Sequence, residues 1–171
     1  MAIVGSMQSK VLDLPVRGAD AIEILLNDHR TIESLLERLL EARGAREQTA
    51  VFEQLKAALT IHNATEENLV YPALNKVAGK ERESQKLYHE TADANVLVFE
   101  IDTLLKEGDE AAFKAKAQHL RDAILEHIDD EENSAFPHLQ EGVDPEAVEQ
   151  LTESVRELRG ALHFTAPGNN T

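Results

Sequence analysis

The sequence predicts an all-α protein, an up-down-up-down four-helix bundle with a short fifth helix at its C-terminal end. Long stretches are rich in Ala, Leu, Glu, Lys and Gln, which are strong helix formers. Apolar residues recur at alternating intervals of three and four, the spacing of one face of an α-helix. Glycine and proline are scarce, at 8 and 5 of 171 residues. Long helices separated by short breaks are expected to pack as antiparallel neighbours.

The first two helices are predicted between Asp20 and the glycine at 79. Asp20 is a favourable N-cap for the first helix, which is expected to end near Gly44. The second is expected to start near Arg46 and to be interrupted at Pro72. The core-facing positions follow the helical spacing: Ile22, Leu25, Ile32, Leu36 and Leu39 on the first helix, and Phe52, Leu55, Leu59 and Leu69 on the second.

Three further helices are predicted in the second half of the chain. The third is expected over residues 81–106, the fourth over 110–139 with Asp109 as its N-cap, and the fifth over 145–160. Their expected core positions again follow the helical spacing. These positions are Ala92, Val96 and Phe99 on the third helix, Phe113, Ala117, Leu120 and Ile124 on the fourth, and Val148, Leu151, Val155 and Leu158 on the fifth.

The chain is expected to contain one folded domain, because 171 residues suffice for a single well-buried core. The bundle is predicted over residues 20–141, followed by a short helix and a disordered tail over 142–171. Residues 1–19 are expected to form an N-terminal arm, and residues 1–6 resemble an expression scar before a second methionine.

Charge and composition exclude several classes of function. With 17 Lys and Arg against 32 Asp and Glu, the net charge of -15 repels nucleic acid and anionic membranes. Neither a membrane-spanning run nor a signal-peptide pattern is present, so a cytoplasmic protein is expected. The lack of cysteine excludes thiolate metal sites and iron–sulfur clusters, so any bound metal must use histidine and carboxylate ligands.

Ionisable residues interrupt the apolar lines of the predicted helices. Each of the first four helices has one histidine at a predicted inward position, and the second and fourth each add a glutamate four residues later. Burying a carboxylate without compensation costs several kcal/mol, and a pair of metal ions would supply that compensation together with neutral imidazoles. The six candidate site residues are His29, His62, Glu66, His89, His127 and Glu131.

Two segments of the chain repeat one pattern. Residues 62–74 align with 127–139 without a gap, including Tyr71-Pro72 against Phe136-Pro137. Of the 7 histidines, four have an acidic residue four positions later, whereas the acidic fraction of the chain predicts about one. The chain is therefore expected to consist of two helical hairpins of one design, each supplying one histidine and one His-x-x-x-Glu motif.

With this pattern the chain resembles the His-His-Glu cation-binding branch of the hemerythrin-like family over roughly residues 20–140. The resemblance implies two iron ions joined by two glutamates and by an oxo or hydroxo group. The same donors also suit manganese, zinc or a mixed pair. The implied ligands are His29 and His62 for one ion, His89 and His127 for the other, and Glu66 and Glu131 as bridges.

The chain departs from the oxygen carriers of that family in two places. Where their third helix supplies a second histidine, this chain has Asp93, and its last bridging carboxylate, Glu131, follows its histidine by four residues instead of five. Asp93, Glu33 or a tyrosine stays open as an additional ligand. Ferritin-like Glu-x-x-His and protease-like His-Glu-x-x-His patterns do not occur on these lines.

These observations are compatible with three functions. The first expectation is a non-haem di-iron protein that binds or senses oxygen or a related small ligand, as a monomer or homodimer. One alternative is an enzyme that decomposes peroxide or reduces nitric oxide at open metal positions. The other is an iron-responsive or iron-storage module, and the sequence does not decide whether the protein is an enzyme.

Overall fold

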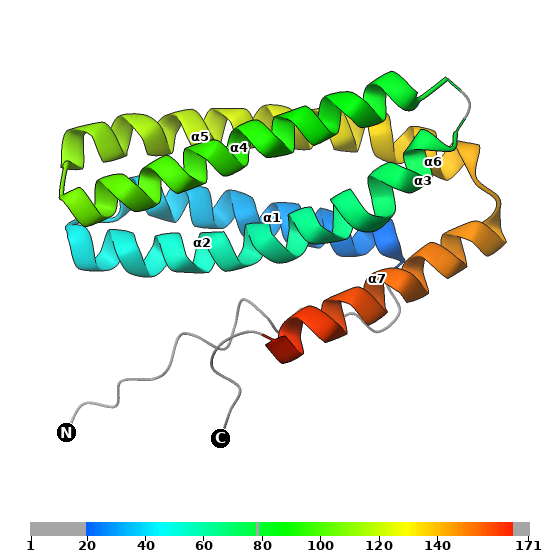
Figure 1. Ribbon diagram of the computed structural model, residues 1–171, viewed down its shortest axis with the longest axis horizontal. Coiled ribbons are helices and arrows are strands. Elements are labelled where there is room, and N and C mark those ends of the chain that lie inside the picture. Colours follow the sequence, from blue (N-terminus) through cyan, green and yellow to red (C-terminus); the bar gives the residue numbers. More distant parts are fainter. Residues whose placement is uncertain (1–19, 78, 166–171) are drawn as a thin grey trace.

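The computed structural model describes residues 20–77 and 79–165, which are all-α, as predicted. Within these ranges four long antiparallel helical rods form a bundle, and a fifth helix lies along one side (Figure 1). The predicted arm over 1–19 and the tail over 166–171 lie outside the described residues. The helices are α1 (Ala21–Glu41), α2 (Ala45–Thr65), α3 (Tyr71–Asn75), α4 (Glu81–Glu107), α5 (Glu110–Asp130), α6 (Phe136–Gly142) and α7 (Pro145–Thr165).

The helix ends follow local chemistry. Asp20 accepts a hydrogen bond from the backbone N–H of Glu23 at 2.9 Å, and Glu23 reaches back to Asp20, which completes a capping box at the start of α1. Asp109 caps α5 in the same way through Ala112 at 2.9 Å. Gly108 ends α4 with a φ of 75°, a left-handed conformation that favours glycine.

Two π-helical turns continue the long rods through their prolines. Segment η2 (Glu66–Val70) joins α2 to α3, and η3 (Glu131–Ala135) joins α5 to α6. Proline lacks an N–H and crowds the carbonyl four residues earlier, so an ordinary α-helical turn is disfavoured just before Pro72 and Pro137. The wider π turn relieves this conflict, and α3 and α6 begin directly at the proline motifs. Both rods therefore continue past the interruption predicted at Pro72.

A polar layer separates two apolar clusters inside the bundle. The larger cluster fills the end near the α4–α5 connection and includes Phe52, Leu55 and Phe113. The smaller one lies between α1, α3, α4 and α6 and includes Leu25 and Leu139. The buried histidines of α1, α2 and α5 and the glutamates that begin η2 and η3 lie along the chain where one cluster gives way to the other.

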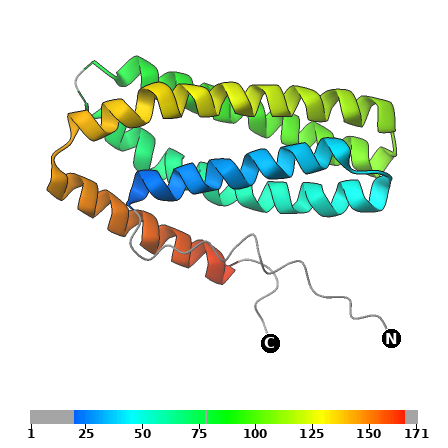
Figure 2. The same ribbon diagram turned by 180° about the vertical axis from the view of Figure 1, so that it is seen from behind.

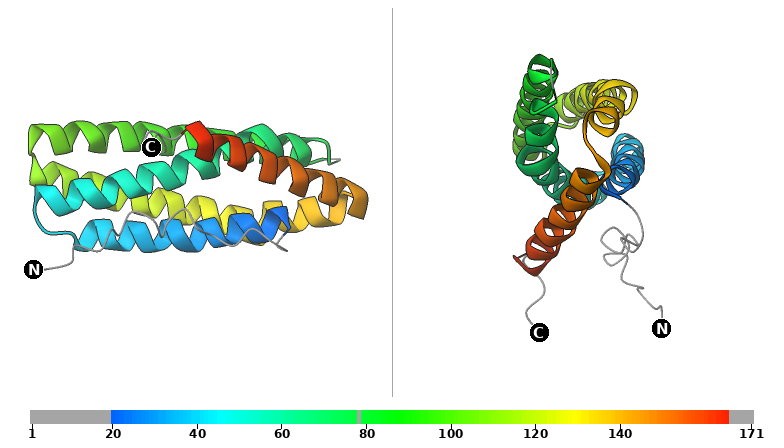
Figure 3. Two further views of the ribbon diagram at one scale, coloured as in Figure 1. Left: turned by 90° about the horizontal axis from the view of Figure 1, so that it is seen from below. Right: turned by 90° about the vertical axis from the view of Figure 1, so that its right-hand side faces the viewer.

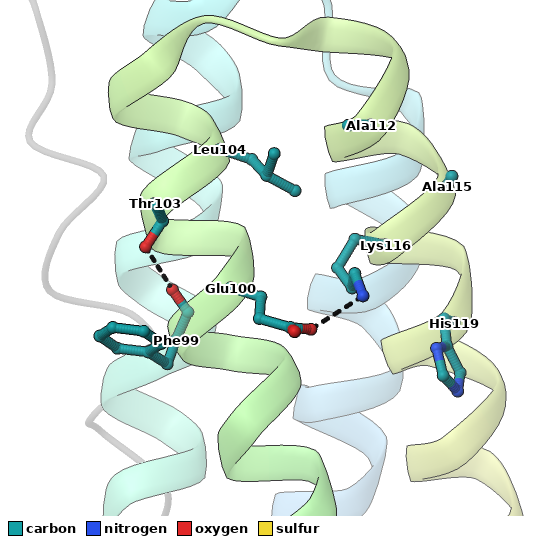
Figure 4. A pocket seen from close by; sticks show the side chains of 8 residues that line it. All are labelled: Phe99, Glu100, Thr103, Leu104, Ala112, Ala115, Lys116 and His119. Atoms are coloured by element: carbon teal, nitrogen blue, oxygen red, sulfur yellow. Dashed lines mark hydrogen bonds and ion pairs between the residues drawn. The ribbon is translucent and has the colours of Figure 1, made fainter.

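The inward face of α4 differs from the predicted one. Val96 and Phe99, predicted as core, are 57% and 72% exposed, and Ala92 is exposed as well. Figure 4 shows Phe99 on α4 beside a surface pocket of about 600 Å³ that is shared with α5. The inward line contains Ser84, Leu87, Thr91, Ala94, Leu97 and Ile101. This line extends over most of the helix, whereas the predicted line covers only about two turns.

Helix α7 is as long as α1, at 21 residues, and extends past the predicted end at Gly160. It crosses the bundle obliquely on the side of α1 and α2 (Figures 2 and 3). Val155 packs with Ala21 and Ile24 of α1, and the Thr152 hydroxyl accepts a hydrogen bond from the Ala21 N–H at 3.0 Å. None of the helices in the described ranges combines the length and apolar character that a membrane crossing needs.

Candidate metal centre

Four predicted site residues converge in the polar layer. His29 comes from α1, His62 from α2, Glu66 from the start of η2 and Glu131 from the start of η3. All four are buried, and one ligand atom of each lies within 4.8 Å of the others. His62 Nε2 is 3.2 Å from Glu66 Oε1, and His29 Nε2 is 3.2 Å from Glu131 Oε2.

The other oxygens of the two glutamates face a second group of donors. His127 Nε2 lies 3.3 Å from Glu131 Oε1. The Tyr71 hydroxyl donates to Glu131 Oε1 at 2.8 Å and lies 3.0 Å from Glu66 Oε2 and 3.1 Å from His127 Nε2. Glu66 therefore presents Oε1 to His62 and His29 and Oε2 to Tyr71, whereas Glu131 presents Oε2 to His29 and Oε1 to His127 and Tyr71.

The π turn of η2 explains how Tyr71 reaches Glu66. In a regular α-helix, residues five apart lie about 140° apart around the axis, on different faces. Here the Tyr71 N–H bonds to the Glu66 carbonyl, five residues earlier, which brings both side chains to the same face. The equivalent residue of the repeat, Phe136, stacks on His29 with ring centroids 5.6 Å apart. The two halves of the site therefore have the same backbone design but different side chains.

Buried atoms without hydrogen bonds indicate that the cluster fits a cation. His29 Nε2, Glu66 Oε1 and Glu131 Oε2 are buried and make no hydrogen bond of adequate geometry. Unpaired buried polar atoms are costly and rare in folded proteins. Within the described part of the chain, no lysine or arginine pairs with Glu66 or Glu131, so a metal ion is the natural partner for these three atoms.

The pKa values of the cluster are shifted because two buried carboxylates lie close together without a neutralising cation. Burial and the neighbouring Glu131 carboxylate raise the pKa of Glu66. Burial acts in the same direction on Glu131, but the nearby His127 and His29 hold its pKa well below the usual range. Burial alone would lower the pKa of His29 and His127, yet contacts with the glutamates raise both to about 10. A metal ion that binds here takes over the role of these protons.

Each buried histidine also faces a carboxylate with its second ring nitrogen. Metal-binding histidines commonly have such a partner, which fixes the ring and directs the other nitrogen toward the metal. The sequence analysis did not identify these carboxylates, although each is adjacent in sequence to a predicted site residue. His29 pairs through Nδ1 with Glu132 at 2.8 Å and His127 with Glu90 at 2.9 Å, both at hydrogen-bond distance. His62 Nδ1 lies 3.5 Å from Asp28, an ion-pair distance without a hydrogen bond.

His89 does not join the cluster. It is exposed on α4, and Thr91 occupies the inward position, with its hydroxyl 3.3 Å from that of Tyr71. The prediction that α4 supplies an inward histidine is wrong because the inward face of this helix was misassigned. Of the open alternatives, Asp93 is also exposed, and Glu33 pairs with an arginine of its own helix.

Two of the remaining histidines also lie outside the cluster. His119 lines the surface pocket between α4 and α5 (Figure 4). His138 pairs with Glu83 at 2.9 Å on the surface. The side chain of His163 is outside the description.

Comparison with known proteins agrees with the fold and the cluster. A helical bundle with buried His and Glu residues between its helices defines a candidate cation-binding protein. Residues 20–139 match the hemerythrin HHE cation binding domain, and the chain belongs to this family.

The fold has a counterpart among solved structures. A hemerythrin HHE cation binding domain-containing protein from Mycobacterium kansasii superposes with a TM-score of 0.60 at 23% identity. The alignment covers 90% of this chain and 95% of the other. This similarity confirms the hemerythrin-like all-α fold.

A curated protein described as a DNA nickase from Nostoc sp. is 24% identical over 149 residues. The match covers 87% of this chain but 42% of the nickase, so the chain spans less than half the length of that relative.

Proposed function

We propose that the protein binds two iron ions in this cluster and uses them to bind or sense oxygen or a related small ligand. The observation that supports the proposal most strongly is the arrangement of the two buried glutamates. Glu66 has one oxygen near His62 and His29 and the other at Tyr71, and Glu131 has one oxygen near His29 and the other near His127 and Tyr71. Two carboxylates that each have donors on both sides are suited to bridging two ions.

The proposed ligand set differs from the set implied by the family resemblance. In this proposal His29 and His62 would hold the first ion, His127 and Tyr71 would hold the second, and Glu66 and Glu131 would each contribute an oxygen to both. His89 is left out because it is exposed on α4. An iron pair would supply redox-active centres to which oxygen, peroxide or nitric oxide can coordinate. Other divalent metals suit the same nitrogen and oxygen donors.

The chain itself positions the donors and protects the site. The carboxylates of Asp28, Glu90 and Glu132 orient the imidazoles, and the two apolar clusters exclude water from both ends of the layer. Before a metal binds, burial and the two neighbouring glutamates raise the pKa of Tyr71 well above its usual value, and its hydroxyl donates a hydrogen bond to Glu131.

A second function, the decomposition of peroxide or the reduction of nitric oxide, is favoured by the same tyrosine. Its hydroxyl contacts Glu66, Glu131 and His127, which gives a hydrogen-bonded path for the protons that such reactions consume. Steady turnover of peroxide or nitric oxide would separate this enzyme from a binding or sensing protein. Nicking of DNA is not proposed, because the chain spans 42% of the nickase and its charge of -15 repels DNA.

The proposal is tested by counting iron per chain after anaerobic reconstitution and recording the absorption spectrum with and without oxygen. We expect about two iron ions per chain in the wild type. Replacing either bridge, by Glu66→Ala or Glu131→Ala, should remove most of the iron because both ions lose a ligand. Glu126→Ala changes an exposed glutamate of α5 and should leave the iron content unchanged. Fewer than about one iron ion per wild-type chain would contradict the proposal.

A further inference from the structure

Helix α7 carries a buried ion pair into the bundle. Arg159 Nη1 donates to Asp28 Oδ2 at 2.6 Å and Nη2 donates to Asp28 Oδ1 at 3.0 Å, a two-pronged contact that fixes the plane of the carboxylate. Arg159 and Asp28 are only 7% and 6% exposed. Arg159 lies outside residues 20–139, the part of the chain that matches the family.

The ion pair between Arg159 and Asp28 is not needed to hold α7 against the bundle. A buried pair of charges is often no more stabilising than apolar residues of similar size, because both charges lose their hydration. Val155 and its contacts on α1 already provide an apolar attachment for α7, and Thr152 adds a hydrogen bond. The ion pair therefore calls for a second role.

The second role of the ion pair is indicated by the contact between Asp28 and His62. Asp28 Oδ2, the oxygen that accepts from Arg159, also lies 3.5 Å from Nδ1 of His62, an ion-pair contact longer than a hydrogen bond of good geometry. The opposite ring nitrogen, Nε2, is 3.2 Å from Glu66 in the cluster. Arg159, Asp28, His62 and Glu66 thus form a continuous chain of contacts from α7 to the candidate metal centre.

His29 and His127 also face carboxylates that pair with a cation, but those cations are more exposed than Arg159. Glu132 beside His29 pairs with Arg30, and Glu90 beside His127 pairs with Lys86 at 3.1 Å. The side chains of Arg30 and Lys86 are 55% and 54% exposed, so water screens their charges, whereas that of Arg159 is 9% exposed. Of the three cations, Arg159 is thus the one that acts on its carboxylate in a largely water-free environment.

We propose that Arg159 is a positioning residue for the metal centre. By fixing Asp28, it holds the His62 ring with Nε2 directed into the cluster, so that α7 is a functional part of the site. The inference rests on the proposed metal-binding function. Because linkage is reciprocal, metal binding must in turn strengthen the docking of α7.

The test measures iron affinity and α7 mobility in the full chain. Ferrous iron is titrated anaerobically against a competing chelator for the wild type, Arg159→Gln and Val155→Ala. Arg159→Gln should weaken iron binding on the order of 10- to 100-fold, the usual effect of removing a partner that orients a metal ligand. Val155→Ala weakens α7 packing without touching Asp28, and its iron affinity should fall far less than that of Arg159→Gln. A purely structural role for Arg159 would give the two variants the same affinity.

Hydrogen exchange gives a readout that does not depend on affinity. In the wild type, iron should slow amide exchange across α7, and in Arg159→Gln this protection should be lost. If Arg159→Gln does not fold, the double variant Asp28→Leu with Arg159→Met removes both charges and avoids an unpaired one. The double variant should fold, and weakened iron binding in it would show that the Asp28–Arg159 pair as a unit supports His62, whereas unchanged binding would contradict the proposal.

The outcomes separate the two proposals. A wild type that takes up no iron refutes the proposed function, and the role of Arg159 with it. A wild type that binds two iron ions, together with variants of unchanged affinity and unchanged α7 protection, refutes the role of Arg159 alone.

Discussion

Tyr71 is the residue that most distinguishes this site from a cluster made of histidine and glutamate alone. Its hydroxyl contacts both buried glutamates, His127 and Thr91. The hydroxyl lies beside Thr91 of α4, and α4 is the helix that was expected to contribute His89 to the cluster. The phenol thus fills a corner of the cluster that an imidazole was predicted to fill.

The exposed position of His89 can be tested by comparing the iron content of variants at His89 and at His62. His89→Ala should leave iron content and affinity unchanged, because the side chain is exposed on α4. His62→Ala should remove a proposed ligand and lower iron binding by at least about 10-fold, as even partners of the ligands contribute that much. Iron content by elemental analysis checks both variants. Loss of iron from His89→Ala would show that α4 turns this histidine inward.

The sequence predicts the residues of the site only as far as local spacing allows. His29, His62, Glu66, His127 and Glu131 were found because they lie on apolar lines that the structure buries. A tyrosine ligand was left open, and the spacing could not single out Tyr71, which in a regular helix would face away from Glu66. Asp28, Glu90 and Glu132 were missed because their partners lie on other helices, and sequence spacing carries no information about such contacts.

At the scale of the elements, the helices and their caps follow from local sequence, but the orientation of α4 does not. Asp20, Gly108 and Asp109 act within one turn of the chain, so their roles are visible in the sequence. Two lines of apolar residues compete on α4, and only packing against α2 and α5 decides between them. The choice reverses the positions of Leu97 and Phe99, because Leu97 is buried and Phe99 is 72% exposed.

The orientation of α4 can be tested by truncating one residue on each line. Leu97→Ala should lower the free energy of unfolding by roughly 2–5 kcal/mol, because it opens a cavity in the larger apolar cluster. Val96→Ala should change it by less than about 0.5 kcal/mol, because Val96 is on the surface. Chemical denaturation of both variants gives the comparison. Equal losses, or a larger loss for Val96→Ala, would contradict the inward line described for α4.

At the scale of the whole molecule, the bundle places charged groups between two apolar clusters, where they are costly unless neutralised. Helix α7 adds a further buried charge pair to this layer from outside the bundle. The fold is thus arranged around a polar layer whose groups are satisfied when a cation is bound. Metal binding and folding should accordingly be linked.

This linkage predicts that iron stabilises the protein. With free iron at about 100 times its dissociation constant, each bound ion should add about 2.7 kcal/mol of stabilisation. For a chain of 171 residues each ion then corresponds to a rise of roughly 5–10 °C in Tm. Calorimetry of the iron-loaded and the chelator-treated protein measures the difference. An unchanged Tm at that iron concentration would show that the polar layer is stable without a metal.

The central claim is that Glu66 and Glu131 bridge two metal ions with different donors on each side. A crystal structure of the iron-reconstituted protein, with anomalous diffraction recorded at the iron edge, tests it most directly. The account predicts two iron peaks between the glutamates, one beside His29 and His62 and the other beside His127 and Tyr71. A single peak, or an iron peak at His89, would contradict it.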